Sequence, residues 1–152
     1  MFDSPVTPIT RQSWLGVLAR ASTAQLTQLL ENAPALPEFQ HLRAPETGMA
    51  MVRGRIGGGG SPFNLGEMTL ARCSVRDAAG RVGHGYAAGR DSTLVELIAR
   101  LDAVLQDEAL FPAYETAVLR PLATAQAERR AGIEARAAAT EVKFFTLATM
   151  RS

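Results

Sequence analysis

The sequence has one cysteine and two histidines among its 152 residues. A single cysteine, Cys73, excludes an internal disulfide and a cysteine-based metal site. His41 and His84 are far apart in the sequence, and without further cysteines they give no reason to expect a metal site. A histidine in this situation is more often a hydrogen-bonded structural residue than a catalyst.

The sequence also has no long apolar run. No segment approaches the ~20 apolar residues that a membrane-spanning helix needs. The opening MFDSPVTPIT lacks the basic region and apolar run of a signal peptide. We therefore expect a cytoplasmic chain that does not enter a membrane. A net charge of +1 gives it no general attraction to nucleic acid, and 47% hydrophobic with 20% charged residues is typical of one globular domain.

Helix-capping signals stand near the start of the chain. Thr10 can cap a helix that runs to about Ala21. Ser22, followed three residues later by Gln25, is a capping-box pattern for a second short helix. The N-terminal part, 1–33, is therefore predicted to be helical.

The second helical part is predicted over 91–140. Asp91 caps the clearest apolar stripe of the chain, with i, i+3, i+4 spacing. Pro112 and Pro121 are predicted to bound a short helical segment. The alanine-rich residues that follow have good helix propensity but few apolar side chains to bury. We therefore expect this helix to depend on contact with another surface. An apolar tail, 141–152, ends the chain.

Between these parts, over 36–89, the periodicity changes from helical to alternating. This pattern predicts an antiparallel meander of three to four strands. The chain is thus expected to be a single α+β domain, 1–152, whose sheet is flanked by N-terminal and C-terminal helices. The predicted strands are Met49–Ile56, Met68–Arg76 and Arg81–Ala88, with Gln40–Ala44 as a candidate for a fourth.

Four consecutive glycines invite a phosphate-cradle interpretation, because glycine backbones can turn several N–H groups toward an anion. No Gly-Lys-Ser/Thr follows, and the next element is predicted to be a strand rather than a helix. A flexible hairpin loop is the better interpretation. The loop residues are Gly57, Gly58, Gly59 and Gly60.

Positive charge is concentrated in the same region, since residues 43–91 hold seven arginines against four acids. If the first two strands pair with their small apolar sides matched, four of these arginines share the opposite side with methionines and a leucine. Arginine mixed with methionine is typical of a protein interface core. We predict a docking surface; anion contact within it and a plain solvated face are the alternatives. The candidate contact residues are Arg53, Arg55, Arg72, Arg76, Arg90 and Glu67.

No catalytic set is evident. Neither a Ser-His-Asp arrangement nor a required pair of carboxylates can be identified, and Cys73 falls on the small apolar side of its strand, as a buried inert thiol would. An RNA-binding sheet would need exposed aromatics on adjacent strands, and only Tyr86 is available. Phe144 and Phe145 would favour aggregation if left uncovered, so we expect them either to pack back on the sheet or to be covered by a partner, and we favour the partner.

The central run resembles a known family. Its residues are Glu46-Thr47-Gly48, Arg53-Gly54-Arg55-Ile56 with the four glycines, Pro62 to Thr69, Arg72, Val75-Arg76, Gly80, Gly83, Tyr86 and Gly89-Arg90-Asp91. Thr10-Arg11-Gln12 with Trp14, and Val142-Lys143 with Phe144-Phe145-Thr146, extend the likeness to both ends. In order and spacing the chain is similar to the PhnG family, the G subunit of the phosphonate carbon–phosphorus lyase core complex.

The resemblance implies an accessory role in a cytoplasmic transferase complex, ribose 1-methylphosphonate 5-triphosphate synthase. Such subunits assemble with the H, I and J subunits and transiently with an ATPase-like L subunit; I is the expected main contact. The reaction moves an alkylphosphonate onto the ribose of ATP and releases adenine. ATP is then a substrate of the complex, and the chain itself needs no cofactor. No catalytic residue of the family carries over to this sequence. The alternative is a stand-alone phosphate- or nucleotide-binding module.

Overall fold

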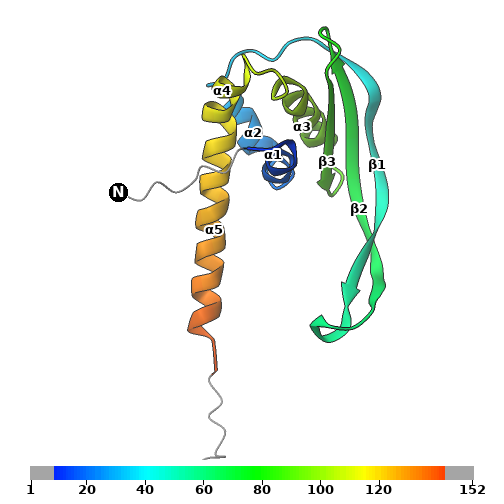
Figure 1. Ribbon diagram of the computed structural model, residues 1–152, viewed down its shortest axis with the longest axis vertical. Coiled ribbons are helices and arrows are strands. Elements are labelled where there is room, and N and C mark those ends of the chain that lie inside the picture. Colours follow the sequence, from blue (N-terminus) through cyan, green and yellow to red (C-terminus); the bar gives the residue numbers. More distant parts are fainter. Residues whose placement is uncertain (1–8, 143–152) are drawn as a thin grey trace, which may run out of the picture.

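Three strands form one antiparallel sheet in the order β1-β2-β3, and helices cover one of its sides (Figure 1). The computed structural model describes residues 9–142. The predicted α+β class and the meander are confirmed. The elements are α1 (Arg11–Leu18), α2 (Thr23–Leu30), β1 (Phe39–Arg55), η1 (Ile56–Gly58), β2 (Pro62–Asp77), β3 (Val82–Ala88), α3 (Ser92–Val104), α4 (Phe111–Tyr114), η2 (Glu115–Leu119) and α5 (Arg120–Ala139).

Both predicted N-terminal capping sites are present. The Thr10 hydroxyl accepts from the Ser13 backbone N–H at 3.2 Å, and the Thr10 N–H donates to the Ser13 hydroxyl at 2.9 Å. Ser22 and Gln25 make the same reciprocal pair at the start of α2. Each box satisfies donors that have no partner inside a helix, which is why two helices of only eight residues start where they do.

The sheet has three strands, so the predicted fourth strand, Gln40–Ala44, is not a separate element. It is the beginning of β1, which runs for 17 residues. Irregularities in the pairing of β1 between His41 and Glu46 interrupt its alternation. Pro45 also lies in this stretch, and it is tolerated because β1 is an edge strand. The sequence therefore resembles two strands where one is built.

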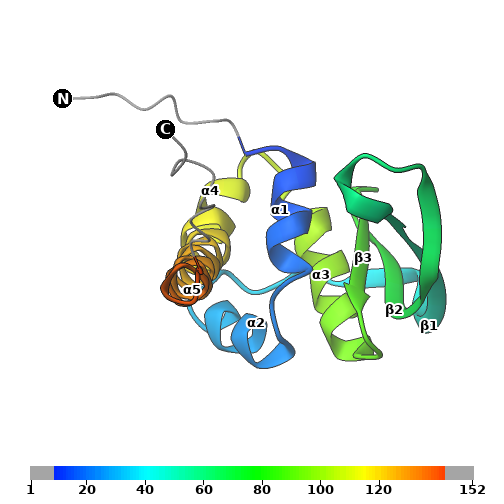
Figure 2. The same ribbon diagram turned by 90° about the horizontal axis from the view of Figure 1, so that it is seen from below.

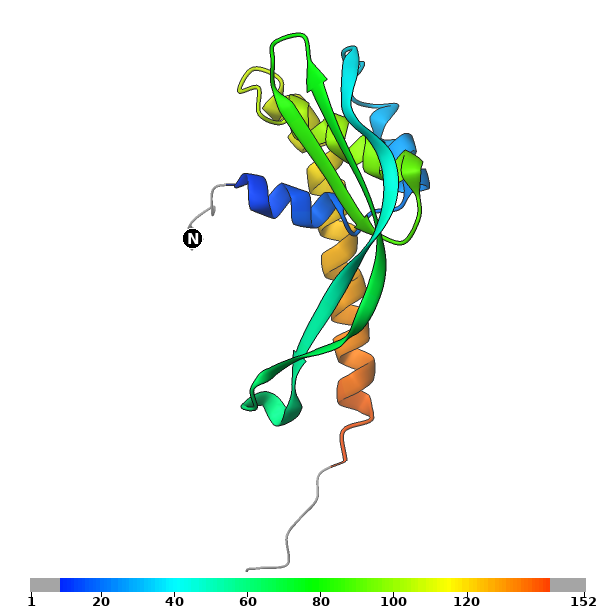
Figure 3. The same ribbon diagram turned by 90° about the vertical axis from the view of Figure 1, so that its right-hand side faces the viewer.

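β1 and β2 extend well beyond β3. β3 pairs only with the segment of β2 from Leu70 to Arg76, so residues 49–69 form a two-stranded hairpin outside the three-stranded sheet. We call these residues the hairpin arm. The arm twists and projects from the body of the molecule, and α5 projects in the same direction on the other side of the helical layer (Figures 1 and 3).

The core lies between the sheet and α3, with α1, α2 and α5 packed behind (Figure 2). α3 approaches β3 very closely at two glycines. A Cβ atom on Gly85 would lie 1.9 Å from the Val95 carbonyl oxygen, and one on Gly83 would lie 1.9 Å from that of Ala99. No side chain fits there, so the two glycines set the distance between helix and strand.

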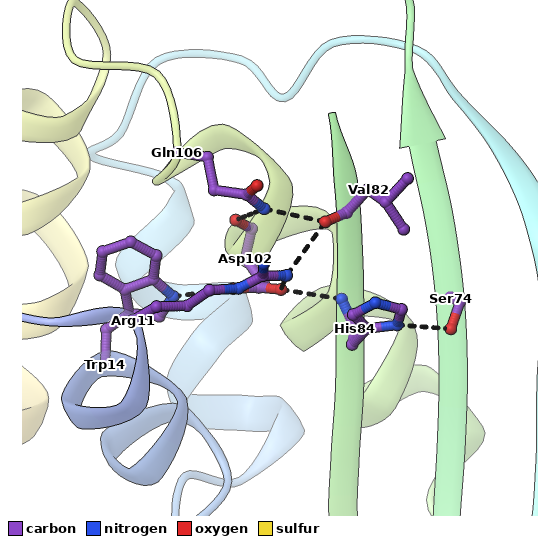
Figure 4. A network of polar contacts seen from close by, with 7 residues as sticks. All are labelled: Arg11, Trp14, Ser74, Val82, His84, Asp102 and Gln106. Carbon is purple, nitrogen blue, oxygen red and sulfur yellow. Dashed lines mark hydrogen bonds and ion pairs between the residues drawn. The ribbon is translucent and has the colours of Figure 1, made fainter. Parts of the chain in front are cut away.

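A buried carboxylate ties this core together (Figure 4). Asp102 on α3 is fully buried and accepts from the Trp14 indole at 2.8 Å, from the His84 backbone N–H at 2.9 Å and from the Arg11 guanidinium at 2.6 and 3.1 Å. The Arg11 guanidinium and the Gln106 amide also donate to the Val82 carbonyl oxygen. One side chain of α3 thereby fixes both α1 and β3.

The C-terminal helices are longer than predicted. Residues 111–139 are helical throughout, so Pro121 does not end a separate segment. Proline lacks an N–H and its ring collides with the carbonyl of the preceding turn. The π-helical turn η2, directly before α5, widens the helix at that point and accommodates Pro121 without a break.

We predict that Gly85→Ala destabilises the chain by about 3 kcal/mol or more, because its Cβ would collide with the backbone of α3 rather than with a flexible side chain. Urea unfolding of the purified chain measures this. Gly66→Ala is the matched control, since nothing lies within 4 Å of a Cβ at that position of the arm. Equal stability of the two variants would contradict the close packing described here.

Asp102→Ala is expected to lower the free energy of unfolding by about 3 kcal/mol, because it leaves the Trp14 and His84 N–H groups without an acceptor. Arg11→Ala should cost less, about 1 kcal/mol, since the Arg11 side chain is 42% exposed. Chemical unfolding of both variants gives the order. If Arg11→Ala were the more damaging change, the carboxylate would not be the centre of the network.

Candidate interaction surface

The hairpin arm exposes an unusual amount of apolar surface. Ile56 is 75% exposed, Met49 65% and Leu65 60%. The other exposed large apolar residues of the arm and its tip are Met51, Phe63 and Met68. An isolated two-stranded hairpin is marginal in water, and concentrated apolar exposure of this kind marks an interaction site. The arm is therefore the strongest candidate for a docking element.

The predicted common face of four arginines is wrong. The register pairs Met49 with Thr69 and Met51 with Glu67. This places the methionines of β1 on the same side of the sheet as α3, which covers that side only where the sheet has three strands. Arg53 and Arg55 continue that side, since side chains alternate along a strand. Arg72 and Arg76 lie on the opposite, outer side, with Ser74 and Tyr86.

The prediction failed because it assumed that the small apolar sides of the two strands match. In the structure the small residues of β1 oppose Met68 and Gly66 instead. Leu65 is an extra residue of β2, because Val52 pairs with Gly66 and Arg53 with Asn64. A Cβ on Gly54 would lie 2.5 Å from the Leu65 side chain, so that glycine provides the space for the bulge.

The outer side of the sheet carries an exposed ion cluster. Glu46 accepts from the guanidinium groups of Arg43 and Arg72, both at 2.6 Å. The hydrogen bonds from Arg43 and from Arg72 hold the pKa of the Glu46 carboxyl below its usual range. Tyr86, on the neighbouring strand, is 52% exposed beside Arg72. Arg72 thus already has a carboxylate partner within the chain.

The glycine loop forms the tip of the hairpin arm. Gly57 and Gly58 have φ of 62° and 73°, which only glycine adopts without strain. The Gly60 N–H donates to the Ile56 carbonyl oxygen, so this donor closes the turn rather than facing a ligand. The loop of residues 57–60 therefore closes a hairpin, as the sequence predicted.

The remaining predicted contact residues are dispersed. Glu67 is exposed on the arm, and Arg90 is exposed at the turn after β3. Phe144 and Phe145 lie outside the described residues.

Ser74, His84 and Asp102 meet at β3 but do not form a catalytic triad. The Ser74 hydroxyl and the His84 ring Nδ1 are 2.8 Å apart. Asp102, however, accepts from the backbone N–H of His84 and not from its ring, so it does not orient the imidazole as a triad acid does. Within residues 9–142 no group of three potential metal-ligating side chains is found.

The single cysteine is inert by its position. Cys73 is fully buried under α3, and burial raises the pKa of its thiol to about 11. The prediction that this thiol is buried is confirmed. Among the described helices, none is long and apolar enough to cross a membrane.

A second exposed surface was not identified from the sequence. Arg20, at the end of α1, lies in an open groove with Arg129 and Arg130 of α5. The alanine-rich composition of α5 suggested that it leans on something, but it did not show which of its residues face the body of the molecule. Their spacing from Leu122, the buried residue of α5, was the available signal.

Comparison with known proteins gives a consistent assignment. The family model described as phosphonate metabolism protein PhnG matches residues 9–150. A protein of Rhizobium meliloti (strain 1021), named alpha-D-ribose 1-methylphosphonate 5-triphosphate synthase subunit PhnG, is 42% identical over 137 residues, which cover 90% of this chain and 87% of that protein. The resemblance found in the sequence is thereby confirmed, and the chain belongs to the PhnG family.

Proposed function

We propose that this chain is an accessory subunit of a ribose 1-methylphosphonate 5-triphosphate synthase and that it docks on the I subunit through the hairpin arm. The relative of 42% identity is named as a subunit of that synthase. The observation that carries the proposal is the arm itself, with six large apolar residues exposed on two strands and the turn that joins them, where no third strand or helix covers them.

In this proposal the chain acts by binding, not by chemistry. The complex transfers an alkylphosphonate onto the ribose of ATP and releases adenine, in the cytoplasm, with the H, I and L subunits. The J subunit joins the same core, and Phe144 and Phe145 add to the contact with I. The described residues offer no nucleophile with an oriented base, which agrees with an assisting role.

A stand-alone phosphate- or nucleotide-binding module receives less support. Its four arginines would have to converge, but Arg53 and Arg55 lie on one side of the sheet and Arg72 on the other. Arg72 is already paired with Glu46. The glycine loop lies at the tip of the arm, where three of its glycines are exposed.

We expect co-expression with the I subunit to yield a complex that survives purification, and Met51→Asp to weaken it. Burying Met51 in an interface contributes about 2 kcal/mol, so losing it corresponds to a roughly thirtyfold weaker affinity. Ala79→Asp is the control, since it adds the same charge at an exposed turn at the opposite end of β2. A wild-type chain that stays monomeric beside the I subunit would refute the proposal, and an undiminished affinity of Met51→Asp would refute the role of the arm.

Calorimetry of the isolated chain with ATP and with methylphosphonate should give no binding heat. The reason is that the arginines do not converge on the glycine loop. Micromolar binding without partner subunits would instead favour the stand-alone module, and Arg53→Ala would then locate the site.

A further inference from the structure

A groove runs between the end of α1 and the middle of α5. Its volume is about 600 Å³. The groove is separate from the hairpin arm and from the outer side of the sheet. Its lining residues are Arg20, Gln126, Arg129, Arg130, Ile133 and Glu134.

The groove lies on the side of α5 that faces α1. The Gln126 side-chain amide donates to the Val17 carbonyl oxygen at 2.8 Å and holds this side of the helix against the end of α1. Arg129, Arg130 and Ile133 follow Gln126 at intervals of three, four and seven residues, which places them on the same side one and two turns further along. Beyond Gln126 every residue of α5 is exposed.

The charges of the groove are unbalanced. Three guanidinium groups line it against one carboxylate, Glu134. No carboxylate of the described residues lies within ion-pair distance of Arg20, Arg129 or Arg130. Six other described arginines have a carboxylate partner: Arg11, Arg43, Arg72, Arg81, Arg100 and Arg120. The remaining described ones, Arg53, Arg55, Arg76, Arg90 and Arg136, have none within the described chain, but none of them lines this groove.

An apolar side chain is part of the same surface. Ile133 is 54% exposed and follows the two arginines on the helix. Neighbouring arginine and isoleucine suit a protein segment better than a phosphate group, because a phosphate would gain nothing from the isoleucine. Guanidinium groups bind carboxylates with paired, directional hydrogen bonds.

We propose that this groove binds an acidic segment of a partner subunit, whose carboxylates pair with Arg20, Arg129 and Arg130 and whose apolar side chain covers Ile133. The inference rests on the proposed function in that the partner belongs to the synthase. It adds a second contact, electrostatic where that of the hairpin arm is apolar, and it gives the projecting α5 a surface to lie on.

The test uses the full-length chain and the remaining synthase subunits, with affinity measured at low and at physiological salt. We expect Arg129→Glu and Arg130→Glu each to weaken binding about tenfold at low salt, and the difference to shrink as salt screens the charges. Arg136→Glu is the matched control, an equal charge change further along the same helix, beyond the residues that line the groove. It should alter affinity less than twofold.

Each other result overturns the inference in a recognisable way. If the wild-type chain binds and Arg129→Glu binds equally well, the groove is no contact, while the proposed function stands. If the wild-type chain does not bind at all, the proposed function fails and this inference with it. A drop in the melting temperature of the isolated chain for Arg129→Glu, but not Arg136→Glu, would identify a segment of the chain itself as the occupant. Binding of tripolyphosphate to the isolated chain, lost in Arg129→Glu, would identify a phosphate site.

Discussion

The structure depends on one buried carboxylate. Asp102 stands in the middle of the apolar side of α3, where an unpaired charge would be very costly. It is tolerated because two elements supply donors: Arg11 and Trp14 from α1, and the backbone of β3 at His84. These contacts leave α1, α3 and β3 little freedom to shift relative to one another. Since β2 and then β1 pair outward from β3, the direction of the hairpin arm is also set from this point.

Close packing at two glycines completes this arrangement. Gly83 and Gly85 let the backbone of α3 approach β3 so closely that no Cβ fits between them. The other side of β3 carries His84 and Tyr86 toward solvent. In the body of the molecule, α3 is thus packed tightly on the short strand β3, and the Asp102 carboxylate holds α1 against both elements. The two long elements that project from it, the arm and α5, have few such contacts of their own.

How far the sequence could predict this structure differed between elements. Local chemistry was sufficient where a motif acts within a few residues, as in the helix caps at Thr10 and Ser22. It was insufficient for the pairing of β1 and β2, because alternation does not specify register and the Leu65 bulge shifts it. Likewise, no signal in the sequence indicated the role of Asp102, because its hydrogen-bond partners lie 18 to 91 residues away in the chain. The groove at Arg129 also depended on which side of α5 faces α1.

The difference between the tightly packed body and the two projecting elements, the hairpin arm and α5, has a physical consequence for assembly. A chain that buried the apolar residues of its own arm would need a fold that brings the arm back onto the body, and the rigid link through β3 opposes this. The arm and α5 therefore stay apart in the free chain, with Met49 and Leu65 exposed on one and Ile133 on the other. Preorganisation of the body lowers the entropic cost of binding, because it sets the direction in which each of the two surfaces projects. A partner that meets both at once gains more than from either alone.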